Sequence, residues 1–286
     1  KGSNNTHFGA YAGHYATGSQ NTFVGKDAGK GGQTSAPFSS GEKNVAIGYQ
    51  ALDAFTTGYE NVAVGTGAGG ALTTGYTSTF VGHGAGASAT TAGNNNYFGY
   101  AAGLGTTGGG NVGIGNHVMK AGSGDAADNT AVGGSSLYAI TTGDKNTTLG
   151  QSTGEALTTT SNTVLIGYQA GYAINSTDAN GTVAIGYQAG HDITSGKYNT
   201  AIGYLALDAE DDGDGNTAVG YQALTSQTGT SGEMGSTALG YKAGTSLTTG
   251  KGNTLLGYDA GRYQTTQTYN TVVGWQSSKR NYKGEH

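Results

Sequence analysis

One short phrase returns sixteen times along this chain and limits what the chain can fold into. The phrase is an Asn, two small or β-branched residues, an apolar residue and a Gly, as in residues 44–48 and 216–220. We call its last residue the anchor glycine, and most successive anchor glycines are 17 residues apart. They are Gly9, Gly25, Gly48, Gly65, Gly82, Gly99, Gly115, Gly133, Gly150, Gly167, Gly186, Gly203, Gly220, Gly240, Gly257 and Gly274. A period this short holds neither a helix pair nor a propeller blade, so each unit is predicted to be one turn, or rung, of a stacked coil.

The repeat predicts an all-β fold, a parallel β-solenoid (β-roll) of about sixteen 17-residue rungs. Because the repeat continues without a linker, we expect residues 1–286 to form a single repeat domain with no separate second domain. At about 4.8 Å between neighbouring strands, the rungs would make a rod roughly 75 Å long.

Composition excludes several classes of protein. The 56 glycines come with a single Pro and without a Gly-X-Y period, which excludes collagen, and apolar residues recur too regularly for disorder. Only 11% of residues are charged and the net charge is −5 without a basic run, so nucleic acid is not an expected partner. No stretch approaches the roughly 18 apolar residues that insertion into a membrane requires. Cysteine is absent, which excludes disulfides and thiolate metal sites.

Alternation along each phrase suggests which side chains face inward. The residue before the anchor glycine is apolar in every unit, as in Ile47 and Val219, and we predict that it forms the core. The residue two earlier, Thr or Val in most units, shares its face and should also point inward. The residue between them, such as Phe23 or Ala46, lies on the opposite face and is also apolar or small. A strand that is apolar on both faces needs a second cover, and we predict that two further copies of the chain supply it in a homotrimer.

The Asn four residues before the anchor glycine is present in twelve units. Stacked in successive rungs, its amide can bond to the copies above and below, so we predict an asparagine ladder. Glycosylation is the functional alternative, and the candidates that head an Asn-X-Ser/Thr triplet are Asn4, Asn146, Asn175 and Asn180. Segments such as residues 56–58 and 141–143 are predicted turns, and the longer gaps at residues 30–43 and 225–235 should bulge as loops.

The phrases at residues 44–48, 61–65 and 182–186 resemble the head repeats of trimeric autotransporter adhesins of the YadA type. The Asn-Thr-Ala-Val-Gly-Tyr-Gln-Ala-Leu version at residues 216–224 resembles repeats of phage tail fibres. This resemblance implies a left-handed β-roll of three chains and a role in adhesion or fibre formation outside the cell. The period of 17 residues is longer than that of the adhesin repeats.

Few motifs indicate chemistry. Residues 103–108 match a dinucleotide fingerprint by letters, but no βαβ pattern surrounds them. The six histidines are scattered without a catalytic pattern, so we predict that the chain is not an enzyme. The weak calcium candidates are the carboxylates of an acidic loop, Asp208, Glu210, Asp212 and Asp214. Asp208, Glu210, Asp212 and Gly213 resemble the opening of an EF-hand loop, but the twelfth position is Val219 instead of the bidentate Glu, so a solvated acidic loop is favoured over a calcium site. No cofactor is expected beyond this weak calcium candidate.

An aromatic residue follows the anchor glycine in seven consecutive rungs. These residues are Tyr168, Tyr187, Tyr204, Tyr221, Tyr241, Tyr258 and Trp275. We expect them to stack between rungs, and the functional alternative is a platform for saccharide rings.

The favoured function is a structural and adhesive fibre module, extracellular, on a cell surface or on a virion, that presents repeated weak contacts on a stiff rod. Its expected partners are copies of itself and cell-surface glycans or a host receptor. Repeat sequence reaches close to both termini without a recognisable cap, so a filament that grows head to tail is an alternative. Ice binding, which uses flat Thr arrays, is a minor alternative, because the recurrent Thr is expected to point inward.

Overall fold

The computed structural model describes residues 2–32, 38–229 and 232–278. The protein is a parallel β-solenoid in which nearly every rung contains one three-residue strand, and its only helix within the described ranges is a single turn, η1 (Thr177–Ala179). The predicted fold class is therefore confirmed. The chain divides into two compact units, Lys1–Asp144 and Lys145–His286, which are described separately below. That the whole chain acts as a single domain stays a prediction.

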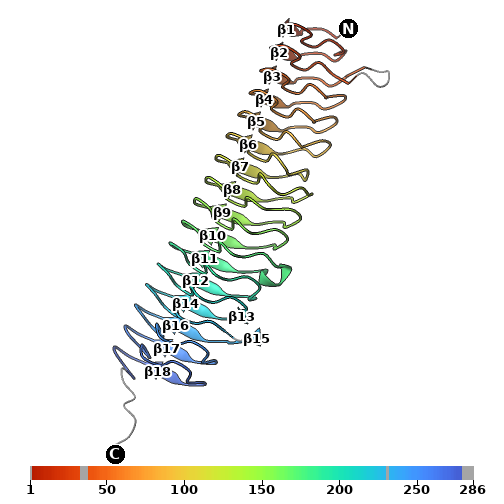
Figure 1. Cartoon of the computed structure of the whole chain (residues 1–286). Helices are drawn as coiled ribbons and strands as arrows, with labels where there is room; N and C mark the ends of the chain where they lie inside the picture. The colour runs from red at the N-terminus through yellow and green to blue at the C-terminus, as the bar shows by residue number, and fades with distance from the viewer. Residues whose placement is uncertain (1, 33–37, 230–231, 279–286) are drawn as a thin grey trace, which may run out of the picture. The chain divides into compact units, whose positions relative to one another are not determined.

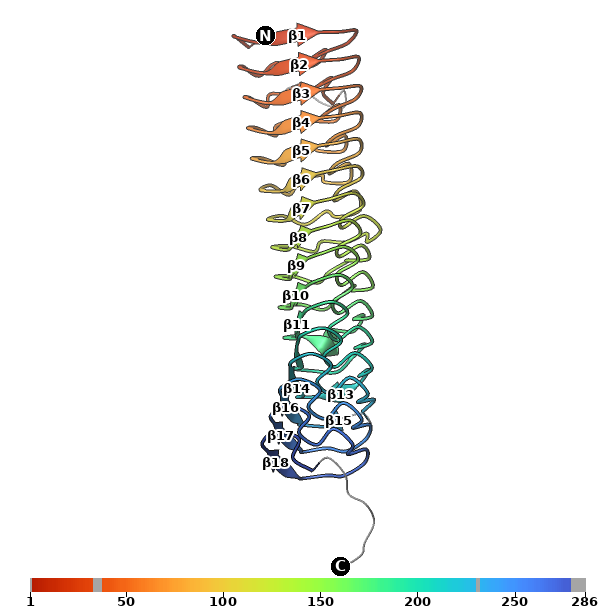
Figure 2. The same ribbon diagram turned by 90° about the vertical axis from the view of Figure 1, so that its left-hand side faces the viewer.

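In the first unit eight strands follow one another in chain order, and each pairs in parallel with the next (Figures 1 and 2). The pairing keeps the repeat in register, so that Val45, Ala46 and Ile47 lie beside Val62, Ala63 and Val64. The strands are β1 (Thr6–Phe8), β2 (Thr22–Val24), β3 (Val45–Ile47), β4 (Val62–Val64), β5 (Thr79–Val81), β6 (Asn96–Phe98), β7 (Val112–Ile114) and β8 (Thr130–Val132).

The second unit repeats this arrangement with eight strands and adds a small side sheet. Its main strands are β9 (Thr147–Leu149), β10 (Val164–Ile166), β11 (Val183–Ile185), β12 (Thr200–Ile202), β14 (Thr217–Val219), β16 (Thr237–Leu239), β17 (Thr254–Leu256) and β18 (Thr271–Val273). The side sheet pairs β13 (Gly213–Asp214) with β15 (Gly232–Glu233), so part of the predicted loop at residues 225–235 is a strand. Residues 33–37 of the other predicted loop lie outside the described residues.

The anchor glycine ends each strand in a backbone conformation that other residues rarely adopt. Gly48 has φ +135°, and a Cβ on it would lie 2.6 Å from the carbonyl oxygen of Gly65 in the next rung. Its amide donates to the carbonyl of Val24 in the preceding rung at 2.8 Å. Glycine is thus required twice, for its positive φ and for the close approach of the next rung.

The middle residue of each strand faces the interior, contrary to the sequence-based expectation. Phe23 and Ala46 are fully buried, whereas Ile47, Leu149 and Leu239, which precede anchor glycines, are 40 to 49% exposed. The prediction that this apolar position forms the core, with the Thr or Val two residues earlier, is therefore wrong. Alternation separates the two faces of a strand, but it does not say which is inside when both are apolar.

Two further columns complete the interior, at four and seven residues after the anchor glycine. Where the strand contributes a large side chain, the first of these positions is Gly, and a Cβ on Gly29 would strike the ring of Phe23. Where the strand contributes Ala46, the same position is the buried Leu52. The second column is apolar in most rungs, for example the buried Phe55. In these rungs a large residue at one position faces a small one at the other. Where both are small, as with Ala63 and Gly69, large side chains of the neighbouring rungs approach, and a Cβ on Gly69 would lie 2.8 Å from Phe80.

The predicted asparagine ladder is present. Asn61 is buried, its Oδ1 accepts the Ser78 backbone N–H at 3.0 Å, and its Nδ2 donates to the Gly75 carbonyl at 2.9 Å. A second ladder was not foreseen: the Thr73 hydroxyl donates to the Thr90 carbonyl one rung on, at 3.0 Å. The asparagine ladder satisfies backbone groups that the short strands leave unpaired. The Thr73 hydroxyl is instead an additional donor to a carbonyl that already accepts the Thr73 backbone N–H at 2.7 Å.

Candidate functional sites

The outward face of the sheet is a candidate interaction surface. Each strand begins with Thr or Val and ends with an aliphatic residue or Phe in nearly every rung, and both positions point away from the interior. In β12, β14, β16, β17 and β18 the first residue is Thr without exception. The surface therefore carries one row of hydroxyl and methyl groups beside one row of apolar side chains.

The seven aromatic residues after the anchor glycines form a continuous ladder. Neighbouring ring centroids are 4.8 to 6.4 Å apart and the rings are within 23° of parallel. Each Tyr in the ladder is about 40% exposed, and Trp275 is 71% exposed. Because neighbours cover the ring faces, the Tyr residues present mainly ring edges and hydroxyl groups. The geometry favours stacking between rungs over a platform that needs free ring faces.

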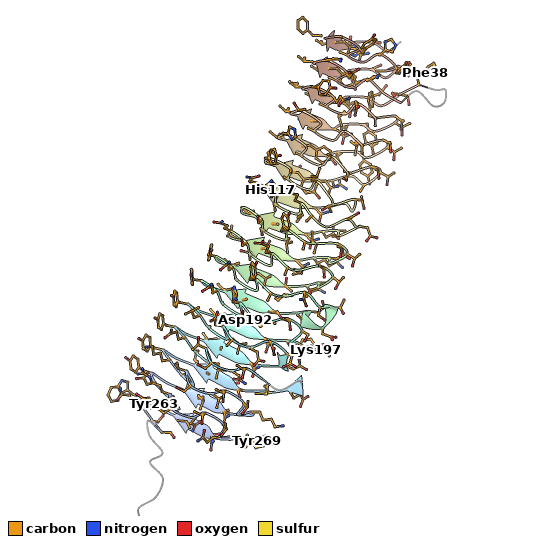
Figure 3. The ribbon with its side chains drawn as sticks, viewed as in Figure 1. Phe38, His117, Asp192, Lys197, Tyr263 and Tyr269 are labelled. Carbon is orange, nitrogen blue, oxygen red and sulfur yellow. The ribbon has the colours of Figure 1, made fainter. Side chains whose placement is uncertain are left out.

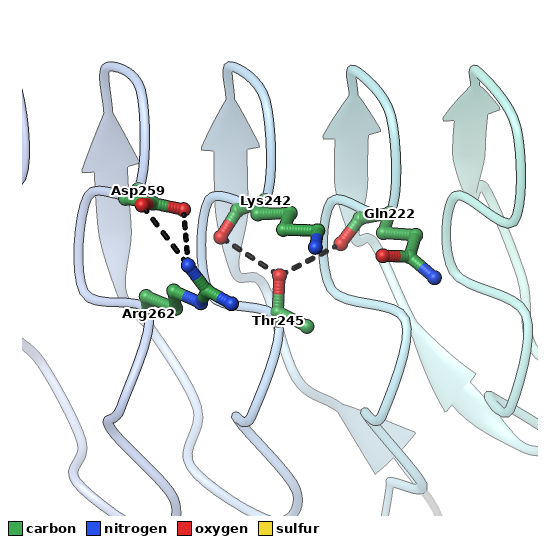
Figure 4. Close-up of polar contacts among 5 residues, drawn as sticks. All are labelled: Gln222, Lys242, Thr245, Asp259 and Arg262. Atoms are coloured by element: carbon green, nitrogen blue, oxygen red, sulfur yellow. Dashed lines mark hydrogen bonds and ion pairs between the residues drawn. The ribbon is translucent and has the colours of Figure 1, made fainter.

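Polar contacts hold the turns that follow the ladder (Figure 4). The hydroxyl of Thr245 bonds to the carbonyls of Lys242 at 2.8 Å and of Gln222, one rung earlier, at 3.1 Å. The Arg262 guanidinium contacts both carboxylate oxygens of Asp259, at 3.1 and 3.3 Å, and Asp259 is 2% exposed. These contacts fix the turns rather than forming an open binding site.

An open aromatic hollow of about 360 Å³ lies in the first two rungs. It is lined by Tyr11, His14, Tyr15, Lys26, Asp27 and Lys30. Phe38, labelled in Figure 3, stacks on Tyr15 with ring centroids 6.0 Å apart. The Lys30 ammonium lies 3.5 Å from the Asp27 carboxylate. Exposed aromatic rings beside a paired carboxylate and ammonium are suited to a ligand with hydroxyl groups and an apolar face, such as a sugar.

The four calcium candidates do not converge. Asp214 lies on β13, and its carboxylate accepts the Lys197 backbone N–H at 2.8 Å. Asp208 is half-buried, and burial raises its pKa. Glu210 is fully buried, so it does not belong to the solvated loop that the charge run suggests. Among the four, only Glu210 and Asp212 lie in one group of neighbouring carboxylates.

That group contains Glu210, Asp211 and Asp212, whose oxygens lie within 4.8 Å of one another. One Glu210 oxygen accepts the Gly213 N–H at 2.8 Å and the other accepts from the Asn216 amide at 3.4 Å. Burial raises the pKa of Glu210 to about 7, and the charges of Asp211 and Asp212 act in the same direction. We assign Glu210 to the interior of its rung and do not assign the three carboxylates as metal ligands.

The glycosylation candidates differ in their surroundings. Asn146 is 1% exposed and donates its Nδ2 to the Thr160 carbonyl at 2.9 Å, so in the folded rung this nitrogen is not available for a glycan. Asn4 and Asn175 are exposed, and Asn180 is partly exposed. These three remain candidates.

The nucleotide-fingerprint letters at residues 103–108 belong to an ordinary rung. A Cβ on Gly103 would strike the ring of buried Tyr97, and Thr106 is buried in the interior column seven residues after Gly99. No helix begins in this segment. These glycines serve packing between rungs.

Fold and surfaces together define a parallel β-solenoid repeat protein. Neither a protein-family model nor a curated protein sequence matches the chain. Among the described residues no helix has the length and apolar character needed to span a bilayer. The resemblance to adhesin and tail-fibre repeats therefore rests on the repeated phrase itself.

Proposed function

We propose that the chain is a structural and adhesive fibre module that works outside the cell, on a cell surface or on a virion. The observation that carries this proposal is the outward apolar row along the sheet, with side chains such as Leu149 and Leu239 nearly half exposed. A continuous apolar surface of this kind is typical of an interface. Copies of the same chain are the favoured cover, and the resemblance to trimeric head repeats supports three of them.

The energy of such an association can be bounded. Full burial of an aliphatic side chain contributes about 1.5–3 kcal/mol, so covering a half-exposed one contributes about 1 kcal/mol. The eight rungs of either unit would together contribute about 8 kcal/mol, which is comparable to the roughly 4–15 kcal/mol that association costs. An interface covers such a row on each chain, so the apolar contribution is of the size that association requires.

Light scattering on the purified chain tests this proposal. We expect the mass of a trimer, and we expect Ile202→Asp to reduce it because this residue lies in the outward row. Tyr198→Asp is the matched control, since Tyr198 is 72% exposed and lies outside that row. A monomer mass for the unaltered chain would refute association through this face, and long filaments in electron micrographs would favour the head-to-tail alternative.

Adhesion also requires a contact with a partner, and we assign it to the aromatic hollow rather than to the tyrosine ladder. Tyr11 is 58% exposed and has no parallel ring stacked on it, unlike the ladder residues. A cell-surface glycan is the ligand class that this lining favours. Glycan-array binding that is unchanged in Tyr11→Ala would refute this assignment.

Ice binding is a second candidate, because one specific observation favours it. The first residues of β12, β14, β16, β17 and β18 are all Thr and face outward. The sequence-based argument against ice binding, that the recurrent Thr points inward, therefore no longer applies. Ice binding and self-association need the same face. A monomer with thermal hysteresis supports ice binding, whereas a trimer without it supports the fibre module.

A further inference from the structure

The interior column seven residues after the anchor glycine changes character in the second unit. Leu157, Ile174 and Ile193 occupy it in three consecutive rungs, and all are buried. The next two rungs place Glu210 and Gln227 there, also with no exposed surface. A carboxyl group and an amide thus replace apolar side chains inside the solenoid.

The backbone around Glu210 is shaped to hold its carboxyl group. A Cβ on Gly213 would lie 2.6 Å from Glu210 Oε1, and a Cβ on Gly229 would also strike this atom. Gly213 begins β13, and Met234, which follows β15, lies against the same place. The carboxyl group therefore lies beneath the side sheet that joins these two rungs.

Within the part of the chain that the structure describes, no cation is paired with this carboxyl group. The charged groups that act on it are Asp211 and Asp212 of its own turn, and both are acidic. The following rung presents the neutral Gln227 and Met234, and the preceding rung presents Ile193 at the same column position. None of the ion pairs found among the described residues includes Glu210. Burial of an unpaired carboxylate disfavours its charged form.

A neighbouring acceptor lacks a donor. Gln227 donates its Nε2 to Asn216 Oδ1 at 3.3 Å, and Asn216 in turn donates to Glu210 Oε2 at 3.4 Å. The Oε1 atom of Gln227 is buried and has no hydrogen-bond partner among the described residues. A proton on Glu210 would add a donor to this group of buried acceptors, whereas a carboxylate would add only further acceptors.

We propose that Glu210 is a neutral acid in the folded protein and that its ionisation opens the turns joined by β13 and β15, which makes this segment a pH-sensitive weak point. Residues 208–229 and 232–235 would open locally while more distant rungs stay folded, because each rung of a solenoid contacts only its neighbours.

The direction of the pH effect follows from the pKa of Glu210, which is raised by burial from 4.5 to about 7. The closed form binds the proton more tightly than the open form. The free energy of opening the segment therefore decreases as the pH rises above about 4.5 and reaches its lowest value above about 7. Between pH 5.5 and pH 8 the opening equilibrium should increase about 30-fold.

Hydrogen exchange measures this opening directly. The amides of Met234 and Gly235 both donate to the Asp214 carbonyl at 3.1 Å and report on the side sheet. After correction for intrinsic exchange rates, we expect their protection to fall about 30-fold between pH 5.5 and pH 8. Glu210→Gln should make protection independent of pH in this range. Glu233→Gln, at an exposed position on β15, is the matched control and should behave like the unaltered chain.

Two results would overturn the proposal. One is equal protection of these amides at both pH values in the unaltered chain. The other result needs no variant. It is an NMR titration of the unaltered protein in which the carboxyl carbon of Glu210 titrates with the pKa of an ordinary glutamate instead of near pH 7. This titration keeps the proposal testable if Glu210→Gln fails to fold.

Discussion

Replacing Leu165 by Ala and Gly171 by Leu in the same chain should restore most of the stability that either substitution alone removes. Leu165 is the middle residue of β10 and is fully buried. A Cβ on Gly171 would lie 2.8 Å from the Leu165 Cδ2 atom, so the glycine leaves room for the leucine. The two positions share one volume inside the rung.

Another rung already contains the arrangement that the double variant would create. The rung of Gly133 combines Ala131, Leu137 and Ile140, all buried, and Leu137 adopts φ +48°. In the rung of Gly167 the third position is the buried Ile174, so the two substitutions reproduce the same set of side chains.

The magnitudes follow from packing. Leu165→Ala leaves a cavity and should cost about 3 kcal/mol. Gly171→Leu should also cost about 3 kcal/mol, of which about 1 kcal/mol is the left-handed backbone conformation and the rest is overpacking against Leu165. Independent effects would sum to about 6 kcal/mol. The double variant should lose only about 1–2 kcal/mol, since the left-handed strain remains and the cavity is filled.

Hydrogen exchange of individual rung amides is the suitable assay, because a repeat array need not unfold in one step. The amide of Gly190, which donates to the Ala206 carbonyl at 2.9 Å, reports on the next rung. A double variant whose loss equals the sum of the single losses within about 0.5 kcal/mol would refute the reasoning.

Two further predictions concern the backbone and the ladder. Gly203→Ala should cost about 3 kcal/mol or more, because φ is +136° at this position and the new Cβ would collide with the Gly220 carbonyl. The amides of β12 and β14 should then lose protection from hydrogen exchange. Asn61→Ala should cost about 2–6 kcal/mol, because it leaves the Gly75 carbonyl and the Ser78 N–H buried without partners. The exchange protection of the Val62 amide, which donates to the Ser78 carbonyl at 2.8 Å, should fall, and unchanged protection would contradict the ladder's role.

The repeat period alone predicted the solenoid, the register of its strands and the asparagine ladder, because each depends only on stacking equivalent residues. It did not identify the interior face. Both faces of each strand are apolar, so alternation was not decisive. A signal was present in the sizes of two positions: Phe80 accompanies Gly86, whereas Ala201 accompanies Leu207. Such reciprocal sizes indicate that the middle strand residue and the position four after the anchor glycine share one space.

The candidate sites were predictable to a smaller extent. Spacing placed Tyr204 and Tyr221 in one column, but only coordinates show that the rings cover one another's faces, at 5.1 Å between centroids. The run of acidic residues suggested a solvated loop, although counting seven residues from Gly203 places Glu210 at the position that Ile193 holds one rung earlier. A repeat position therefore predicted burial better than local charge did.

The alternation of side chains along each strand links the interior to the outward surface. In β12 the buried Ala201 lies between Thr200 and Ile202, which point outward, and β14 repeats this pattern one rung on. A turn that opens at Glu210 removes packing behind these two strands, so their outward side chains lose the fixed spacing that an interface requires. In the proposed assembly of copies, ionisation of Glu210 would then weaken association at these rungs first. Strands such as β10, which contact neither rung, would keep their arrangement, because coupling in a solenoid passes between adjacent rungs.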